Sequence, residues 1–425
     1  MKLFPGSSSG SRARGDARRE RRGLPDKSYS LPRGFRFAAS ACGLKRNKGL
    51  DLGLLTSDVP ASAAGVFTTN LVQAAPVVLS RKHLRNSHGR MRAVVVNSGN
   101  ANCSTGPEGF RASRATAVEV ARRIGCARHE VVVCSTGVIG VPLRVEKILR
   151  ALPRLAVAQS DSARDFAQFA RAIMTTDLVP KWASASCRIG GKVVRLLGCA
   201  KGSGMIHPDM ATMLAFVVTD ASIAAPLLQR VVGEITQRTF NAITVDGDTS
   251  TNDTLLVLAN GASGCPRVAR ASGNFRRFSR ALETICHSLA MQIVADGEGA
   301  QRVVEIEVRG ARSPAGAKQI AKTIATSALV KTAFAGGDPN WGRILAAAGR
   351  SGVPFKPERA EITMAGTRVY RRGRALPFSE VTASKRLVAP RVKISMDLRQ
   401  GRASARAWTC DLTAEYVRIN ASYRT

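Results

Sequence analysis

One segment near the middle of the chain constrains its chemistry most. The run Lys201-Gly-Ser-Gly-Met-Ile-His-Pro-Asp-Met-Ala-Thr-Met-Leu-Ala-Phe216 places Thr212 between a glycine-rich turn and an apolar stretch. A threonine hydroxyl attacks a carbonyl only when a base removes its proton. If the Ala211-Thr212 bond is cut, the freed α-amine of Thr212, with a pKa near about 8, is that base. Thr212 is therefore either the nucleophile of a self-processing enzyme or an ordinary threonine that packs beside a strand or caps a helix.

The charge balance favours a different class of protein. The chain has 64 Lys and Arg against 30 Asp and Glu, a formal net charge of +34, and such an excess attracts phosphate backbones. Residues 1–34 hold nine basic and three acidic residues, so most of the charge is spread through the body. The body has no dense basic helix, zinc-finger spacing or aromatic-flanked RNA motif. We expect no specific nucleic-acid recognition, and a basic nucleic-acid-binding protein is the alternative outside enzymes.

Cysteine and histidine usage argues against a disulfide framework and a metal centre. The nine cysteines show no Cys-x-x-Cys spacing, and the five histidines form no His-x-x-x-His pair. We therefore expect reduced thiols, no metal and a cytoplasmic location. Cys134 is expected to be a small buried apolar side chain. No apolar run is long enough to span a bilayer, so no membrane partner is expected.

The first 33 residues form a separate basic extension. They are rich in Arg, Ser and Gly and lack the apolar core of a secretory signal. Asp16, Glu20 and scattered glycines interrupt any amphipathic helix of the kind that targets organelles. A disordered tail is the prediction, and a targeting peptide is the alternative.

Hydrophobic periodicity predicts alternating strands and helices in both halves of the chain. Strands are expected within 34–78 and over 93–97, 130–134, 212–219, 254–259 and 301–309. Helices are expected over 109–123, 225–239 and 277–295, with two more in 147–172 that are interrupted around Pro153 and Asp161. This irregular alternation, with no internal repeat, predicts α/β layers.

Five long motifs occur in an order that is typical of one enzyme family. They are Lys201-Gly-Ser-Gly-Met-Ile206, Met210-Ala-Thr-Met-Leu214, Thr244-Val-Asp-Gly-Asp-Thr-Ser-Thr-Asn-Asp-Thr254, Asp296-Gly-Glu-Gly-Ala300 and Asp338-Pro-Asn-Trp-Gly-Arg-Ile344. Over residues 34–425 the chain resembles the glutamate N-acetyltransferase (ornithine acetyltransferase) family of arginine biosynthesis. The resemblance implies a layered α/β sandwich built from two autoproteolytic fragments, 34–211 and 212–425. It also implies that two copies of each fragment assemble into a heterotetramer.

The resemblance assigns two groups that would stabilise an oxyanion beside Thr212. In Cys134-Ser-Thr-Gly-Val-Ile-Gly140, they are the Thr136 hydroxyl and the Gly137 backbone N–H. The alternative is an ordinary strand-to-helix turn in which Thr136 caps the helix.

Substrate-binding residues are carried over from the family in the same way. They are Thr175, Lys201, Thr212, Glu298, Asn420 and Thr425. Lys201 suits a substrate carboxylate, although an isolated lysine is ordinarily a solvated surface charge. Glu298 lies between glycines that are expected to expose it, and it suits a substrate amine; the alternative is a solvent-facing turn carboxylate.

Two further motifs are expected to be structural. The 244–254 loop contains three aspartates but lacks the spacing of a calcium loop, so turn chemistry around the active site is predicted. The motif that begins at Asp338 is expected to form a rigid turn, with Arg343 paired to a carboxylate or lining the pocket.

The resemblance implies a ping-pong acetyltransferase that matures by cutting itself between Ala211 and Thr212. Thr212 would take acetyl from N²-acetylornithine, release ornithine and pass the acetyl group to glutamate, with no cofactor or metal. Some members of the family also use acetyl-CoA as the donor. An N-terminal-nucleophile peptidase or amidase of similar architecture is the alternative within enzymes.

Overall fold

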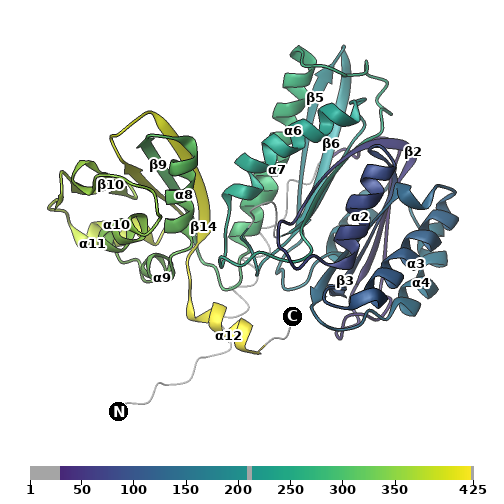
Figure 1. Ribbon diagram of the computed structural model, residues 1–425, viewed down its shortest axis with the longest axis horizontal. Coiled ribbons are helices and arrows are strands. Elements are labelled where there is room, and N and C mark those ends of the chain that lie inside the picture. Colours follow the sequence, from purple (N-terminus) through teal and green to yellow (C-terminus); the bar gives the residue numbers. More distant parts are fainter. Residues whose placement is uncertain (1–28, 208–212, 423–425) are drawn as a thin grey trace.

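The computed structural model describes residues 29–207 and 213–422, which form two β-sheets with covering helices (Figure 1). The larger sheet has the strand order β4-β3-β2-β8-β7-β6-β5, with β1 paired to β2. Its strands are β1 (Phe35–Ser40), β2 (Leu52–Phe67), β3 (Arg90–Asn100), β4 (Val131–Val138), β5 (Lys181–Ile189), β6 (Lys192–Lys201), β7 (Leu214–Thr219) and β8 (Thr254–Ala259). Ala211, Thr212 and Thr425 lie outside the described residues.

Strand β2 joins the two halves of the larger sheet. Its first part pairs with β3, its last part pairs with β8, and the register shifts between Thr56 and Ala61. The two halves share one apolar core, to which β3 contributes Val94 and β7 contributes Phe216. The sheet is therefore folded over on itself, and the ends of distant strands come together.

Helices cover the outer face of each half. Helices α2 (Ala75–Asn86), α3 (Gly106–Ile124) and α4 (Val145–Val157) pack on the half that contains β3 and β4. Helices α6 (Ala225–Arg238) and α7 (Gly273–Ala295) share a core with β6, β7 and β8. The layers run helix, sheet, sheet, helix, and α5 (Ala163–Ala172) adds two phenylalanines to the central core. The prediction of a layered α/β sandwich is confirmed.

Two predicted elements need correction. The strand-rich segment predicted over 34–78 ends at Phe67, because α2 begins at Ala75 with Pro76 in its first turn, where a missing N–H costs no helical hydrogen bond. Pro153 lies inside α4 instead of ending it, since the apolar face that carries Leu152 is buried along the whole helix. The break falls near Asp161, as predicted, before α5 begins.

The smaller sheet forms a second packed unit with the strand order β12-β11-β10-β13-β9-β14. Its strands are β9 (Val303–Ala311), β10 (Glu361–Met364), β11 (Thr367–Arg371), β12 (Arg374–Ala375), β13 (Arg391–Asp397) and β14 (Ala403–Cys410). Its helices are α8 (Pro314–Ala325), α9 (Ala328–Gly336), α10 (Trp341–Gly349) and α11 (Glu380–Leu387). Figure 1 shows α12 (Ala414–Ser422) below the two units.

The predicted fragments do not coincide with these two units. The larger sheet combines β1 to β6, which precede Thr212 in the sequence, with β7 and β8, which follow it. A cut at this point would leave both fragments within one core, and the fragment boundary stays a prediction. Among the described residues, none of the helices has both the length and the apolar character that a bilayer crossing requires.

Candidate active site

The ends of β4 and β6 meet at a buried polar pair. The Nζ of Lys201 donates a hydrogen bond to Oγ1 of Thr136 at 3.0 Å. Thr136 is 8% exposed and Lys201 is 9% exposed. Lys201 is therefore not a solvated surface charge, and the structure brings these two predicted site residues together.

This hydrogen bond decides where the Thr136 proton points. An ammonium group only donates, so Oγ1 of Thr136 accepts, and its own proton is left for another acceptor. Burial lowers the pKa of the Lys201 ammonium, while the nearby carboxylates of Asp177 and Asp253 oppose that shift. The arrangement suits a hydroxyl that donates to a developing negative charge.

Gly137 occupies a position that only glycine fits. Its φ is +131°, and a Cβ atom there would overlap the backbone of Gly99 on β3. Because the two backbones approach each other so closely, the residue after Thr136 must lack a side chain. The alternative role of Thr136 as a helix cap is wrong, because the next helix, α4, is preceded by Arg144.

A buried ion network is hydrogen-bonded to the residue that follows Lys201. The Nζ of Lys181 is 2.6 Å from Oδ1 of Asp177 and 2.6 Å from Oδ2 of Asp296. All three residues are buried. Burial opposes ionisation of Asp177, but Lys181 and Lys201 hold its pKa below the usual value. Burial raises the pKa of Asp296, which Lys181 counteracts.

The network fixes the backbone around the predicted substrate-binding residues. Asp177 accepts hydrogen bonds from the N–H of Gly202 at 2.6 Å and from the N–H of Thr175 at 2.9 Å. Ser203 Oγ donates to the carbonyl of Asp296 at 2.6 Å. Half-buried Thr175 is thus tied to the segment that follows Lys201. The sequence analysis did not predict this network, although Asp296 begins one of the five family motifs and Asp177 follows Thr175 by two residues.

Glu298 is buried, which corrects the prediction that its flanking glycines expose it. It is 5% exposed, and its backbone N–H donates to the carbonyl of Ser203 at 3.0 Å. Gly204 makes the approach possible, because a Cβ atom there would lie 2.5 Å from the Glu298 carboxylate. The Nδ2 of Asn420, on α12, donates to Oε2 of Glu298 at 2.8 Å. The described end of the chain therefore contacts another predicted site residue, while substrate binding by Asn420 stays a prediction.

The 244–254 loop forms hydrogen bonds with residues on both sides of the segment 208–212. Asp246 accepts hydrogen bonds from the N–H groups of Met205 at 2.6 Å and Ile206 at 2.7 Å. On the other side, the N–H of Thr254 donates to the carbonyl of Met213 at 2.9 Å. Burial raises the pKa of Asp246. These contacts agree with the structural role that was predicted for the loop. Among the described residues, no group of three or more His, Cys, Asp or Glu is arranged to hold a metal ion.

The motif that begins at Asp338 belongs to the smaller-sheet unit. Its Asn340 side chain accepts a hydrogen bond from the N–H of Arg343 at 3.2 Å and so begins α10. The Arg343 guanidinium donates to the carbonyl of Leu329 at 2.9 Å. The motif therefore forms the start of a helix, and Arg343 contacts a backbone carbonyl instead of the predicted carboxylate; a role of Arg343 in lining the active-site pocket stays a prediction.

Cys134, near the site, is a buried and protonated thiol. All nine cysteines of the chain are free. Cys134 lies two residues before Thr136 in the central core, and burial raises the pKa of its thiol to about 12. A thiol with this pKa stays protonated at neutral pH, so the predicted apolar role of Cys134 is confirmed.

Residues 36–425 match the model of the ArgJ family. The chain belongs to the ArgJ family. A relative from Geobacter sulfurreducens, named arginine biosynthesis bifunctional protein ArgJ, is 48% identical over 394 residues, which cover 92% of this chain and 99% of that protein. The family resemblance drawn from the five motifs is confirmed, and so is the prediction that the chain is an enzyme of this acetyltransferase family.

Two solved structures are also similar in sequence to this ArgJ-family chain. The ArgJ protein from Bacillus halodurans is 45% identical, with 50% of this chain and all of that chain covered and a TM-score of 0.49. The ornithine acetyltransferase from Mycobacterium tuberculosis, described as complexed with ornithine, is 40% identical, with 42% of this chain and 94% of that chain covered and a TM-score of 0.38.

Proposed function

We propose that this chain transfers an acetyl group from N²-acetylornithine to glutamate through an acyl intermediate on Thr212. The observation that carries the proposal is the Lys201–Thr136 hydrogen bond. Lys201 lies opposite Leu214 in the β6–β7 pairing, and Leu214 follows Thr212 by two residues in the sequence. Through this pairing, the Lys201 member of the polar pair lies beside the start of β7, two residues after the threonine that the family motif assigns as nucleophile. Membership of the ArgJ family supports the choice of substrates.

The enzyme matures when the Thr212 hydroxyl attacks the carbonyl carbon of Ala211. The peptide C–N bond breaks, an ester forms, and the hydroxyl proton goes to the amine. Water then hydrolyses the ester, which leaves a carboxylate on Ala211 and a free α-amine on Thr212. That amine is the base for every later turnover.

Turnover then proceeds in two half-reactions. The Thr212 amine accepts the hydroxyl proton while Oγ1 attacks the acetyl carbonyl of N²-acetylornithine. The Thr136 hydroxyl and the Gly137 N–H donate to the oxyanion, and ornithine leaves as the amine with the proton. The amine of glutamate then attacks the acyl-threonine, and N-acetylglutamate is released. In both halves Lys201 keeps the Thr136 proton directed away from its own ammonium.

The substrate is held by charges of both signs. Lys201 supplies the cation for its carboxylate, and Glu298, positioned by Asn420, supplies the anion for its ammonium group. Thr175 and Thr425 complete the set that the family motifs assign.

Further properties of the enzyme follow from the same family resemblance. We propose that the cycle uses no cofactor or metal and that acetyl-CoA serves as a second acetyl donor, in line with the word bifunctional in the name of the Geobacter sulfurreducens relative. We further propose that two copies of each fragment assemble and that the protein is cytoplasmic.

One assay separates this function from that of an N-terminal-nucleophile peptidase or amidase. The purified protein is incubated with N²-acetylornithine, with and without glutamate, and the products are identified by mass spectrometry. The proposal predicts N-acetylglutamate and ornithine in equal amounts when glutamate is present. Acetate and ornithine at the same rate in both samples, with no N-acetylglutamate, would instead show a hydrolase.

A further inference from the structure

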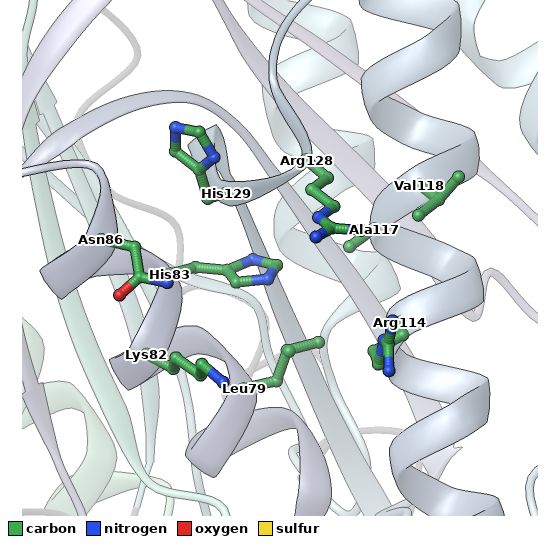
Figure 2. A pocket seen from close by; sticks show the side chains of 9 residues that line it. All are labelled: Leu79, Lys82, His83, Asn86, Arg114, Ala117, Val118, Arg128 and His129. Carbon is green, nitrogen blue, oxygen red and sulfur yellow. The ribbon is translucent and has the colours of Figure 1, made fainter.

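A pocket lies at the opposite end of β4 from Thr136. Its volume is about 250 Å³, and it lies between α2, α3 and the short 3₁₀ turn η1 (Arg128–Glu130). Figure 2 shows the nine side chains that line it: Leu79, Lys82, His83, Asn86, Arg114, Ala117, Val118, Arg128 and His129. The Nδ1 of His83 donates to the carbonyl of Val131, the first residue of β4. Thr136 is five residues further along this strand, roughly 16 Å away.

Basic side chains predominate in the lining of the pocket. Five of its nine residues are basic and none is acidic. Lys82, Arg114 and Arg128 are exposed, and the structure gives none of these three side chains an ion pair or hydrogen bond within residues 29–207 and 213–422. Converging cations that lack counter-ions attract an anion into the hollow between them.

The acidic side chains of the surrounding elements are engaged elsewhere. On α3, Glu119 binds Arg122 at 2.8 Å and Arg123 at 2.7 Å. Glu108, at the start of the same helix, lies 3.5 Å from Arg111. On η1, Glu130 accepts a hydrogen bond from the N–H of Ala127 at 3.1 Å. Helix α2 contains no acidic residue.

A buried histidine lies at the wall of the pocket. His83 is 7% exposed, and Figure 2 shows its ring extending from α2 towards Arg128. Because Nδ1 donates to a carbonyl, the neutral ring carries an acceptor at Nε2. Burial lowers the pKa of His83, and the positive charges of His129, Arg128 and Lys82 lower it further, against the hydrogen bond to Val131. An anion in the pocket would offset these charges and favour a second donor at Nε2.

We propose that this pocket binds the phosphate group of a small phosphorylated molecule. Lys82, Arg114 and Arg128 supply the cations, and a dianion compensates more of their charge than a carboxylate does. The pocket is larger than one phosphate group requires, and Leu79 and Ala117 give it an apolar wall that suits the organic part of the ligand. The site is separate from the acetyl-transfer chemistry and does not depend on the proposed function.

The test is calorimetric titration of the whole purified protein with adenosine monophosphate and, separately, with inorganic phosphate, at about 150 mM salt to screen diffuse surface charge. The pocket variant is Lys82→Gln, Arg114→Gln, Arg128→Gln. Its matched control, Arg270→Gln, Arg276→Gln, Arg280→Gln, removes three exposed cations, one before α7 and two within it. We expect the nucleotide affinity to fall at least about tenfold in the pocket variant and to stay within about twofold in the control. Inorganic phosphate should compete with the nucleotide and bind more weakly.

Three results would overturn the proposal. The first is the absence of binding to the wild-type protein. The second is an equal loss in both variants, which would identify the net charge of the whole surface as the cause. The third is competition by saturating ornithine, which would place the ligand in the active site. Since all six substituted arginines and lysines are exposed, equal thermal unfolding of the three proteins checks that each is folded.

Discussion

Lys201 donates a hydrogen bond to Thr136 at 3.0 Å, although the two residues are 65 positions apart in the sequence. The contact depends on the folding over of the larger sheet, which brings the end of β6 to the end of β4. Because Oγ1 of Thr136 accepts this hydrogen bond, the hydroxyl proton of Thr136 is free to be donated to another group. The chemistry of the proposed site therefore depends on a tertiary contact between two strands that are not neighbours in the sheet.

Thr136→Ala should reduce kcat for acetyl transfer about a hundred- to a thousandfold, because one donor to the oxyanion is lost. KM should change little, since the interaction strengthens in the transition state. Thr136→Ser keeps a hydroxyl at the same place and should retain most of the activity. If the Ala variant kept wild-type kcat while folded, Thr136 would have no role in stabilising the oxyanion.

Lys201→Met should lower kcat and raise KM together, because the ammonium both orients Thr136 and is proposed to bind the substrate carboxylate. The double variant with Thr136→Ala should lose less activity than the product of the two single losses, since each change disrupts the same hydrogen bond. Steady-state kinetics on the four proteins measures this coupling. Strict additivity of the two changes would show that the contact has no catalytic consequence.

Asn420→Ala should raise KM for N²-acetylornithine about five- to tenfold with a smaller effect on kcat, because Asn420 positions the Glu298 carboxylate. Deletion of residues 420–425 should have a larger effect on KM or abolish activity. Ser422→Ala, on the same helix and exposed, is the control and should behave as the wild type. Unchanged kinetics after the deletion would remove the end of the chain from the site.

Lys181→Met should destabilise the protein by about 3–5 kcal/mol at neutral pH, because it leaves two buried carboxylates without a cation. The triple variant Asp177→Asn, Lys181→Met, Asp296→Asn should recover part of this loss. Denaturant unfolding measures both variants. A Lys181→Met protein as stable as the wild type would show that the network contributes nothing to the fold.

The same network sets a pH dependence. The pKa of Asp177 is held below its usual value, so its ionised form stabilises the wild type above about pH 4, and that stability is lost as the pH falls through the lowered pKa. In Lys181→Met the buried carboxylates gain protons at higher pH, which relieves their repulsion. The stability difference between the two proteins should therefore shrink on acidification, and a difference that grows would contradict this account.

Local patterns in the sequence predict most of the elements, because the periodicity of strands and helices is a property of neighbouring residues. The interior position of Pro153 was not predictable, since the packing of both halves of α4 outweighs one lost hydrogen bond. The burial of Glu298 was equally hidden, because it depends on Gly204, which is 94 residues away along the chain.

The family motifs predicted which residues would line the site, and the structure brings Thr136, Lys201, Glu298 and Asn420 into contact in two pairs. The motifs did not predict the ion network around Lys181, whose partners come from two separate segments. Lys181 and Asp296 are 115 residues apart in the sequence, and an ion pair between such distant residues leaves no periodic pattern in the sequence.

Intact-mass analysis of the purified protein shows whether the chain is cut before Thr212. Self-processing predicts two polypeptides for the wild type, one that ends at Ala211 and one that begins at Thr212, and a single uncut chain without activity for Thr212→Ala. A wild-type preparation that transfers acetyl groups while every chain is intact across the Ala211–Thr212 bond would contradict it.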